Sequence, residues 1–197
     1  SIATGRWTEA KKNRMRDSRV SPTKTLISTI NASTNPPQVF LGASATGFYG
    51  NRDEQTCDET TSAGQGFLAE ICVDWERAVL DDQTPETQAK MRTAILRIGV
   101  VLGRTSEFLK NLFKVYNMAI AGPLGSGKQW LSWIHIDDLV KLFCFALDNQ
   151  NAVGVLNATS PEPVRNKQLN ASLAKSLGRP AFMPVPELAL KVLYGEK

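Results

Sequence analysis

Short, unbroken apolar runs alternate along the chain with longer segments whose apolar positions repeat at helical spacing. The apolar runs occur at residues 38–43, 93–102 and 154–159. A short continuous apolar run is typical of a strand that is buried on both faces, as in a parallel sheet. The alternation therefore predicts an α/β fold, in which helices flank a mainly parallel sheet.

Apolar positions four residues apart predict the helices between these runs. One helix carries them from residue 67 onward: Phe67, Ile71, Trp75 and Val79. Ser106 is a predicted N-cap for a second helix. A last helix, which Gly178 ends, carries an apolar stripe: Leu169, Leu173 and Leu177. These spacings place the apolar residues of each helix on one face, where they can pack against a sheet.

The N-terminal segment contains a proline within a helical pattern. Thr8 is a predicted N-cap for a helix over residues 11–16. Further along, Ser21 and Pro22 have the sequence of a new helix start, with a capping hydroxyl before a proline at the first helical position. The sequence therefore predicts two helices here, and the second should end before Pro36.

Composition places the chain among globular proteins. Of its 197 residues, 42% are hydrophobic and 21% are charged, which argues against a disordered chain. No apolar run approaches the roughly 20 residues that a membrane-spanning helix needs. We therefore expect no membrane partner.

The net charge of +4 is unevenly distributed along the chain. Residues 1–24 contain seven Lys and Arg against two acids, whereas residues 51–82 contain nine acids against two arginines. A single basic segment near one end is typical of a solvated helix face. The charge therefore does not predict a nucleic-acid partner.

Cysteine and histidine usage excludes the common metal and disulfide frameworks. Cys57, Cys72 and Cys144 have no Cys-x-x-Cys spacing, and His135 is the only histidine. These counts support neither a zinc site nor a disulfide scaffold. They favour a reducing compartment, such as the cytoplasm, or the plastid stroma if the protein comes from a plant.

Ser44 is the leading candidate for chemistry. It lies in the segment 42–50, GASATGFYG, directly after the first apolar run. Ligands of open α/β sheets bind beyond the carboxyl ends of the strands. The alternative is that Ser44 is only a small residue in a tight turn. A serine hydrolase is disfavoured, because Thr46 stands where the nucleophile elbow requires glycine.

Two later motifs also have structural explanations. The segment GPLGSGKQ at residues 122–129 is close to a phosphate-binding loop, but Gln129 replaces the hydroxyl that would hold magnesium, and no strand precedes the loop. In WIHIDDL, Asp137 is a predicted N-cap, and Asp138 complements the helix dipole. His135 alternates with isoleucines, which favours a hydrogen-bonded structural histidine over an acid–base catalyst.

Four segments, taken in order, resemble the extended short-chain dehydrogenase/reductases, the NAD-dependent epimerase/dehydratase group: VFLGASATGFYG, AILRIGVVLG, GSGKQWLSWIHIDDLV and VLNATSPEPVRNKQL. More narrowly, the chain resembles members labelled SulA-like or cell-division inhibitor. The resemblance implies a Rossmann-like fold, an NAD or NADP cofactor and a small-molecule substrate. It assigns a catalytic role to Ser44, which would polarise a substrate oxygen. It also implies a set of cofactor-binding residues: Ala43, Ser44, Ile98, Gly99 and Val100.

The chain departs from this family pattern in several places. The opening βαβ unit with its GxxGxxG phosphate turn is missing, and we expect the chain to be a fragment with a shortened C-terminal tail. The helix at residues 67–72 lacks the family's Tyr-x-x-x-Lys pair, which supplies general acid–base chemistry. Leu131 stands in place of an arginine that clamps the nucleotide-sugar pyrophosphate, and Val100 in place of a substrate-side asparagine.

These departures decide the predicted activity. We expect an NAD(P)-dependent epimerase- or dehydratase-type protein with weak or no catalysis in this chain. Without the phosphate turn, calorimetric titration should give a dinucleotide affinity weaker than low micromolar. The alternative function is a non-catalytic NAD(P)-binding or protein-interaction module with a link to cell division.

The expected domains are a partial Rossmann-like NAD(P)-binding domain at residues 1–104 and a substrate-side region at residues 105–197. The second region should return one strand, at about 154–159, to the main sheet. Without the family's first strands, the run at residues 38–43 would lie at an open sheet edge. We therefore expect self-association, which sedimentation at high concentration measures.

Overall fold

The computed structural model describes residues 6–118 and 121–180, and it divides into two compact units. The sheet unit comprises Glu9–Ile98 and Asp137–Ala158. The accessory unit comprises Ser1–Thr8, Gly99–Ile136 and Thr159–Lys197. The two chain ends, on which the prediction of a shortened chain rests, lie outside the described residues.

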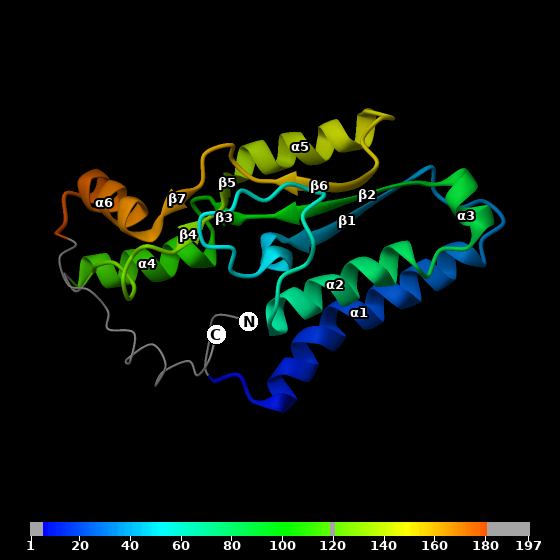
Figure 1. Cartoon of the computed structure of the whole chain (residues 1–197). Coiled ribbons are helices and arrows are strands. Elements are labelled where there is room, and N and C mark those ends of the chain that lie inside the picture. The colour runs from blue at the N-terminus through cyan, green and yellow to red at the C-terminus, as the bar shows by residue number, and fades with distance from the viewer. Residues whose placement is uncertain (1–5, 119–120, 181–197) are drawn as a thin grey trace. The chain divides into compact units, whose positions relative to one another are not determined.

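A three-stranded parallel sheet forms the centre of the sheet unit (Figure 1). Its strands are β1 (Val39–Ala45), β2 (Arg92–Ile98) and β6 (Gly154–Ala158), in the order β1-β2-β6. This arrangement confirms the predicted α/β class and its parallel sheet. In the described part of the chain β1 pairs with β2 alone; self-association through its other edge stays a prediction.

Helices cover both faces of this sheet. Helices α1 (Glu9–Asn31) and α2 (Phe67–Leu80) lie on one face, and α5 (Ile136–Asp148) lies on the other (Figure 1). Ile27 of α1, Val79 of α2 and Ile95 of β2 are buried in one cluster. The predicted apolar face of α2 is confirmed at Ile71 and Val79, which are buried. Phe67 and Trp75 are partly buried and contact Lys12 and Thr23 of α1.

The prediction of two N-terminal helices is wrong, because α1 continues through Pro22. A proline inside a helix removes one backbone hydrogen bond. Packing outweighs this loss: Met15 lies before the proline and Ile27 after it, and both are buried. Around the proline, Thr23 Oγ1 also donates to the Arg19 carbonyl at 2.8 Å. Tertiary contacts thus keep the helix continuous.

The apolar run at residues 93–102 forms two strands rather than one. β2 ends at Ile98, and a separate strand, β3 (Val100–Leu102), pairs with β5 (Trp133–His135) in another sheet. Gly99 separates them, and a Cβ at this position would lie 2.8 Å from the Ser132 carbonyl oxygen. The sheet that each strand joins depends on pairing with distant residues, and a continuous apolar run contains no information about that pairing.

The accessory unit contains the parallel pair β3-β5 and the antiparallel pair β4 (Trp130–Leu131) and β7 (Val164–Arg165). Its helices are α4 (Glu107–Asn117) and α6 (Asn166–Leu177). The Ser106 side chain caps α4 by accepting from Leu109 N, and Gly178 ends α6 in the left-handed region, as predicted.

Some local features differ from the sequence predictions. Asp137, the predicted N-cap, lies inside the first turn of α5 rather than before it. Two short helices were not predicted: the 3-10 helix η1 (Thr46–Tyr49) and α3 (Pro85–Lys90), which Thr84 caps. Such short elements carry little periodic signal.

No helix in the described residues is long and apolar enough to cross a membrane.

β6 lies in the main sheet, where it pairs with β2. The boundary at residue 104 between the two expected domains stays a prediction.

Candidate functional site

Three polar residues lie in one row across the carboxyl end of the main sheet. Ser44 of β1 is opposite Arg97 of β2, and Arg97 is opposite Asn157 of β6. Each is the next-to-last residue of its strand. Because side chains alternate between the faces of a sheet, residues in register project to the same face. The sheet therefore gathers a hydroxyl, a guanidinium and an amide where α/β proteins bind ligands.

Glu76 of α2 joins two members of this row. Its carboxylate accepts a hydrogen bond from Ser44 Oγ at 2.6 Å, and from Arg97 Nε and Nη2 at 2.9 Å and 2.8 Å. The side chains of Arg97 and Glu76 are only 4% and 7% exposed. This is a buried, bidentate ion pair. Each charge has lost its water on burial, and the opposite charge of its partner compensates for that loss.

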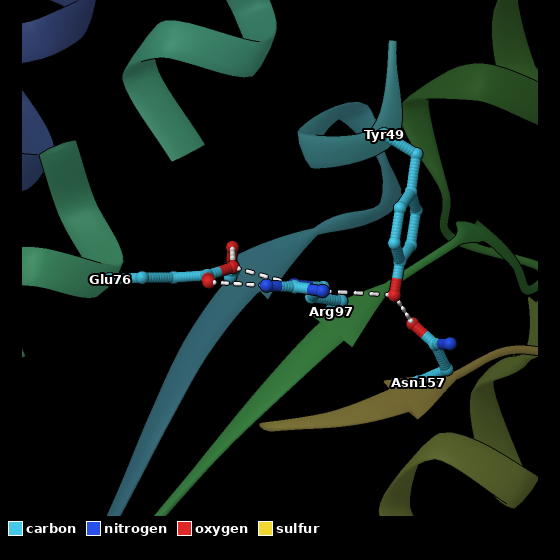
Figure 2. A network of polar contacts seen from close by, with 5 residues as sticks. Tyr49, Glu76, Arg97 and Asn157 are labelled. Atoms are coloured by element: carbon cyan, nitrogen blue, oxygen red, sulfur yellow. Dashed lines mark hydrogen bonds and ion pairs between the residues drawn. The ribbon is translucent and has the colours of Figure 1, made fainter. Parts of the chain in front are cut away.

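Tyr49 extends the network towards β6 (Figure 2). Arg97 Nη1 donates to the Tyr49 hydroxyl at 3.0 Å, and this hydroxyl donates to Asn157 Oδ1 at 2.7 Å. The guanidinium carbon also lies 3.3 Å from the centre of the Phe48 ring. Burial disfavours the charge on Arg97, but Glu76 and Tyr49 outweigh it and raise the pKa of Arg97 above its ordinary value.

The segment 51–66 is a long irregular loop at this edge of the sheet unit. Glu59 Oε1 accepts from the backbone N–H of Asn157 at 2.7 Å. Before it, Asp58 accepts from Thr60 and Thr61, whose side chains hold the pKa of Asp58 below its ordinary value. The loop thus satisfies a backbone donor at the carboxyl end of β6.

The hydroxyl of Ser44 is already committed in this arrangement. Ser44 is 3% exposed, and its proton points to Glu76. The Ser44 oxygen can still accept a hydrogen bond. The five residues Ser44, Glu76, Arg97, Tyr49 and Asn157 therefore form one continuous hydrogen-bonded chain, which we call the carboxyl-edge network.

Cys72 lies beside this network and is the buried one of the three free cysteines. Burial is the main cause that raises the pKa of its thiol above the ordinary value, and the Glu76 carboxylate acts in the same direction. A thiol reacts through its thiolate. We expect a thiol-specific disulfide reagent at neutral pH to label Cys72 at least about a hundredfold more slowly than the exposed Cys144.

Peptide mapping by mass spectrometry at successive times measures this difference, and labelling in urea provides the control. In urea the two rates should become similar, because unfolding exposes Cys72. Equal rates for the two cysteines in the folded chain would contradict the burial of Cys72.

The cofactor-binding residues expected from the sequence fall into two groups. Ala43 and Ser44 lie near the end of β1, and Ile98 is the last residue of β2, opposite Ala45. Gly99 and Val100 belong to the accessory unit, where Val100 N donates to Ser132 O at 2.8 Å. The structure thus brings the first group to one sheet edge. Whether any of them binds a cofactor stays a prediction.

Sequence reasoning missed Glu76, Tyr49 and Asn157. A signal for Glu76 was present: it lies four residues after Cys72 and three before Val79, and all three are buried on α2. An acid on the buried face of a helix requires a partner. Tyr49 and Asn157 carry no such local signal, because they meet across 108 positions of sequence.

The dinucleotide that the family resemblance implies has matching groups in this site for only part of its length. The carboxyl-edge network offers polar groups suited to the nicotinamide end and to a reacting oxygen. No GxxGxxG turn is present in the sequence to hold the pyrophosphate. The glycine-rich loop at residues 122–129 does not replace it, because the N–H groups of Leu124, Gly127 and Lys128 donate to acceptors of the chain itself. The residues of this site therefore suit the nicotinamide end of the dinucleotide but provide no turn for its pyrophosphate.

Residues 6–118 and 121–180 contain no cluster of side chains suited to bind a metal ion. No group of three or more His, Cys, Asp or Glu side chains in this part of the chain is arranged to hold an ion.

Comparisons with known proteins agree with this geometry. The chain is 40% identical over 193 residues to the epimerase family protein SDR39U1 homolog, chloroplastic, of Arabidopsis thaliana, and this alignment covers 97% of the chain and 54% of that protein. A crystal structure of the human epimerase family protein SDR39U1 with NADPH superposes with a TM-score of 0.90 and 28% identity, covering 97% of this chain and 63% of that one.

A nucleoside-diphosphate sugar epimerase from Corynebacterium glutamicum is 35% identical, with a TM-score of 0.71, over 96% of this chain and 41% of that one. The chain thus spans about half to two thirds of the length of the first two relatives, and less of the third. Residues 1–158 match the model of the NAD dependent epimerase/dehydratase family. The chain belongs to the NAD-dependent epimerase/dehydratase family of extended short-chain dehydrogenase/reductases.

Proposed function

We propose that this chain supplies the part of an NAD(P)-dependent epimerase-family protein that holds the nicotinamide end of the cofactor and the reacting oxygen of a small-molecule substrate. When bound, the dinucleotide supplies hydride chemistry. Ala43, Ser44, Ile98, Gly99 and Val100 are the residues proposed to face it. Ser44 is the residue proposed to polarise the substrate oxygen, by turning its proton from Glu76 towards that oxygen.

The carboxyl-edge network is the observation that carries this proposal. Ser44, Arg97 and Asn157 lie in register at the ends of three adjacent parallel strands, and Glu76 fixes the Ser44 hydroxyl at 2.6 Å. A catalytic group contributes most when its orientation is set before the substrate arrives. In this arrangement Glu76 positions Ser44, and Arg97 in turn positions Glu76.

Ser44→Ala tests the proposed role. With NADPH or NADH in excess, and a panel of nucleotide sugars and small carbonyl compounds, we expect a substrate-dependent change in nicotinamide absorbance that Ser44→Ala reduces about a hundredfold. This is the usual effect of removing one positioned hydrogen-bond donor. Ser28→Ala, on the exposed side of α1, should leave the rate unchanged. A reaction that Ser44→Ala leaves intact would contradict the role.

A second function is favoured by a specific observation. Ser44 is 3% exposed and already donates to Glu76, and the facing helix α2 has neither Tyr nor Lys in residues 67–72. This combination suits a non-catalytic NAD(P)-binding or interaction module. Absence of turnover with every compound of the panel, together with partner capture that Ser44→Ala does not alter, would favour it. The link to cell division stays a prediction, as does the cellular compartment.

A further inference from the structure

A concave site lies in the accessory unit, formed by the ends of two strands, the loop that follows the first of them and one helix. Its volume is about 310 Å³, which is at the lower end of the range for small-molecule pockets. Most of its lining is apolar, and the polar groups come from one arginine and the chain's only histidine. The lining residues are Leu102, Gly103, Arg104, Leu109, Phe113 and His135.

The pocket lies where parallel sheets commonly bind ligands, at the carboxyl ends of their strands. Leu102 ends β3 and His135 ends β5, and the two are partners in the parallel register. The pocket therefore opens at the carboxyl ends of both strands, where backbone and loop groups converge. Helix α4 closes one side with Leu109 and Phe113, which lie one turn apart on the same face.

Arg104 differs from the arginines that stabilise the fold. Arg92 donates to three backbone carbonyls, and Arg97 is paired with Glu76. Arg104 is exposed at the rim of the pocket, and no hydrogen bond or ion pair of its guanidinium occurs within the described residues. Its charge is therefore not neutralised by another group of the described residues. A guanidinium with free donors is the preferred protein group for a carboxylate, which it binds through two parallel hydrogen bonds.

We propose that this pocket binds a small amphipathic carboxylate, whose apolar body lies against Leu109 and Phe113 and whose carboxylate is held by Arg104. The pocket contains one permanent positive charge, which matches a monoanion. Its apolar lining favours an aryl or short alkyl body over a sugar, which would leave hydroxyl groups without partners. The proposal goes beyond the function proposed above, because it requires neither a dinucleotide nor Ser44.

The experiment compares 3-phenylpropionate with its neutral amide as probes of the whole chain. In two-dimensional ¹H–¹⁵N NMR titrations, the acid should shift the amide signals of residues 102–104 and 109–113 in a saturable manner. The amide should bind at least about tenfold more weakly, because it lacks the charge-assisted pair with Arg104. Ser44→Ala should not change either titration, which separates this result from the test of the proposed function.

Arg104→Gln is the decisive variant. Arg104 makes no hydrogen bond or ion pair through its side chain within the described residues, and its replacement should make the acid and the amide bind with equal affinity. Lys110→Gln, a neighbouring cation on α4 outside the pocket lining, should retain the tenfold preference for the acid. The proposal is overturned if 3-phenylpropionate does not bind, if its shifts map elsewhere, or if Arg104→Gln keeps the preference.

Discussion

Glu76→Gln is expected to lower the free energy of unfolding by about 3–5 kcal/mol. The substitution keeps the shape of the side chain but removes its charge, so Arg97, only 4% exposed, is left with an uncompensated charge in a buried position. Removing one partner of a buried ion pair typically has an effect of this size, because the remaining ion has lost its water without gaining a counter-charge. Urea unfolding followed by circular dichroism measures the change.

A matched surface pair provides the control. Asp74 of the same helix lies 3.0 Å from Arg16, but the two side chains are 38% and 39% exposed. Solvent screens such a pair, so Asp74→Asn should lower the free energy of unfolding by less than about 1 kcal/mol. Equal effects of the two variants would show that burial of the Arg97–Glu76 pair does not govern its contribution.

A double variant separates the ion pair from its surroundings. Replacing both Glu76 and Arg97 with apolar residues of similar size removes the unpaired charge that each single variant leaves behind. The double variant should therefore be less destabilised than Glu76→Gln alone. The remaining loss would report the hydrogen bonds that Ser44 and Tyr49 make to the pair.

The sequence was informative wherever a signal is local. The apolar runs at residues 38–43 and 154–159 predicted strands close to their observed bounds, since burial on both faces leaves a continuous apolar pattern. Ser106 and Gly178 predicted helix ends, because capping depends on the residues next to the end. Ser44 was singled out for a similar reason: it lies at the end of an apolar run, where a parallel sheet binds ligands, and its role stays a prediction.

What the sequence did not predict depends on contacts between distant segments. Pro22 lies within a helix because α1 packs on α2, and Gly99 separates two strands because each pairs with a different partner. The same applies to the site. Tyr49 and Asn157 meet only after the sheet has set its register. Propensity and periodicity act over a few residues, and tertiary packing overrides them at such positions.

Gly64→Ala is expected to lower the free energy of unfolding by at least about 3 kcal/mol, the upper end of the usual effect of overpacking. A Cβ on residue 64 would overlap the carbonyl group of Tyr49 and lie 2.7 Å from the backbone nitrogen of Gly50. Both neighbours are backbone, so neither can move as a side chain does. The backbone of residue 64 also donates to Phe48 O at 2.8 Å, which fastens the loop over η1.

Gly47→Ala is the matched control, because a Cβ there would make only ordinary contacts at 3.8 Å with Cys72 and Leu68. It should change the free energy of unfolding by less than about 1 kcal/mol. The two variants should also differ in proteolysis at Arg52, whose guanidinium donates to the carbonyls of Ser62 and Ala63 while the loop is closed. Gly64→Ala should accelerate tryptic cleavage there, because release of the loop frees this side chain. If it did not, the close approach of residue 64 to Tyr49 would not be what holds the loop against the carboxyl-edge network.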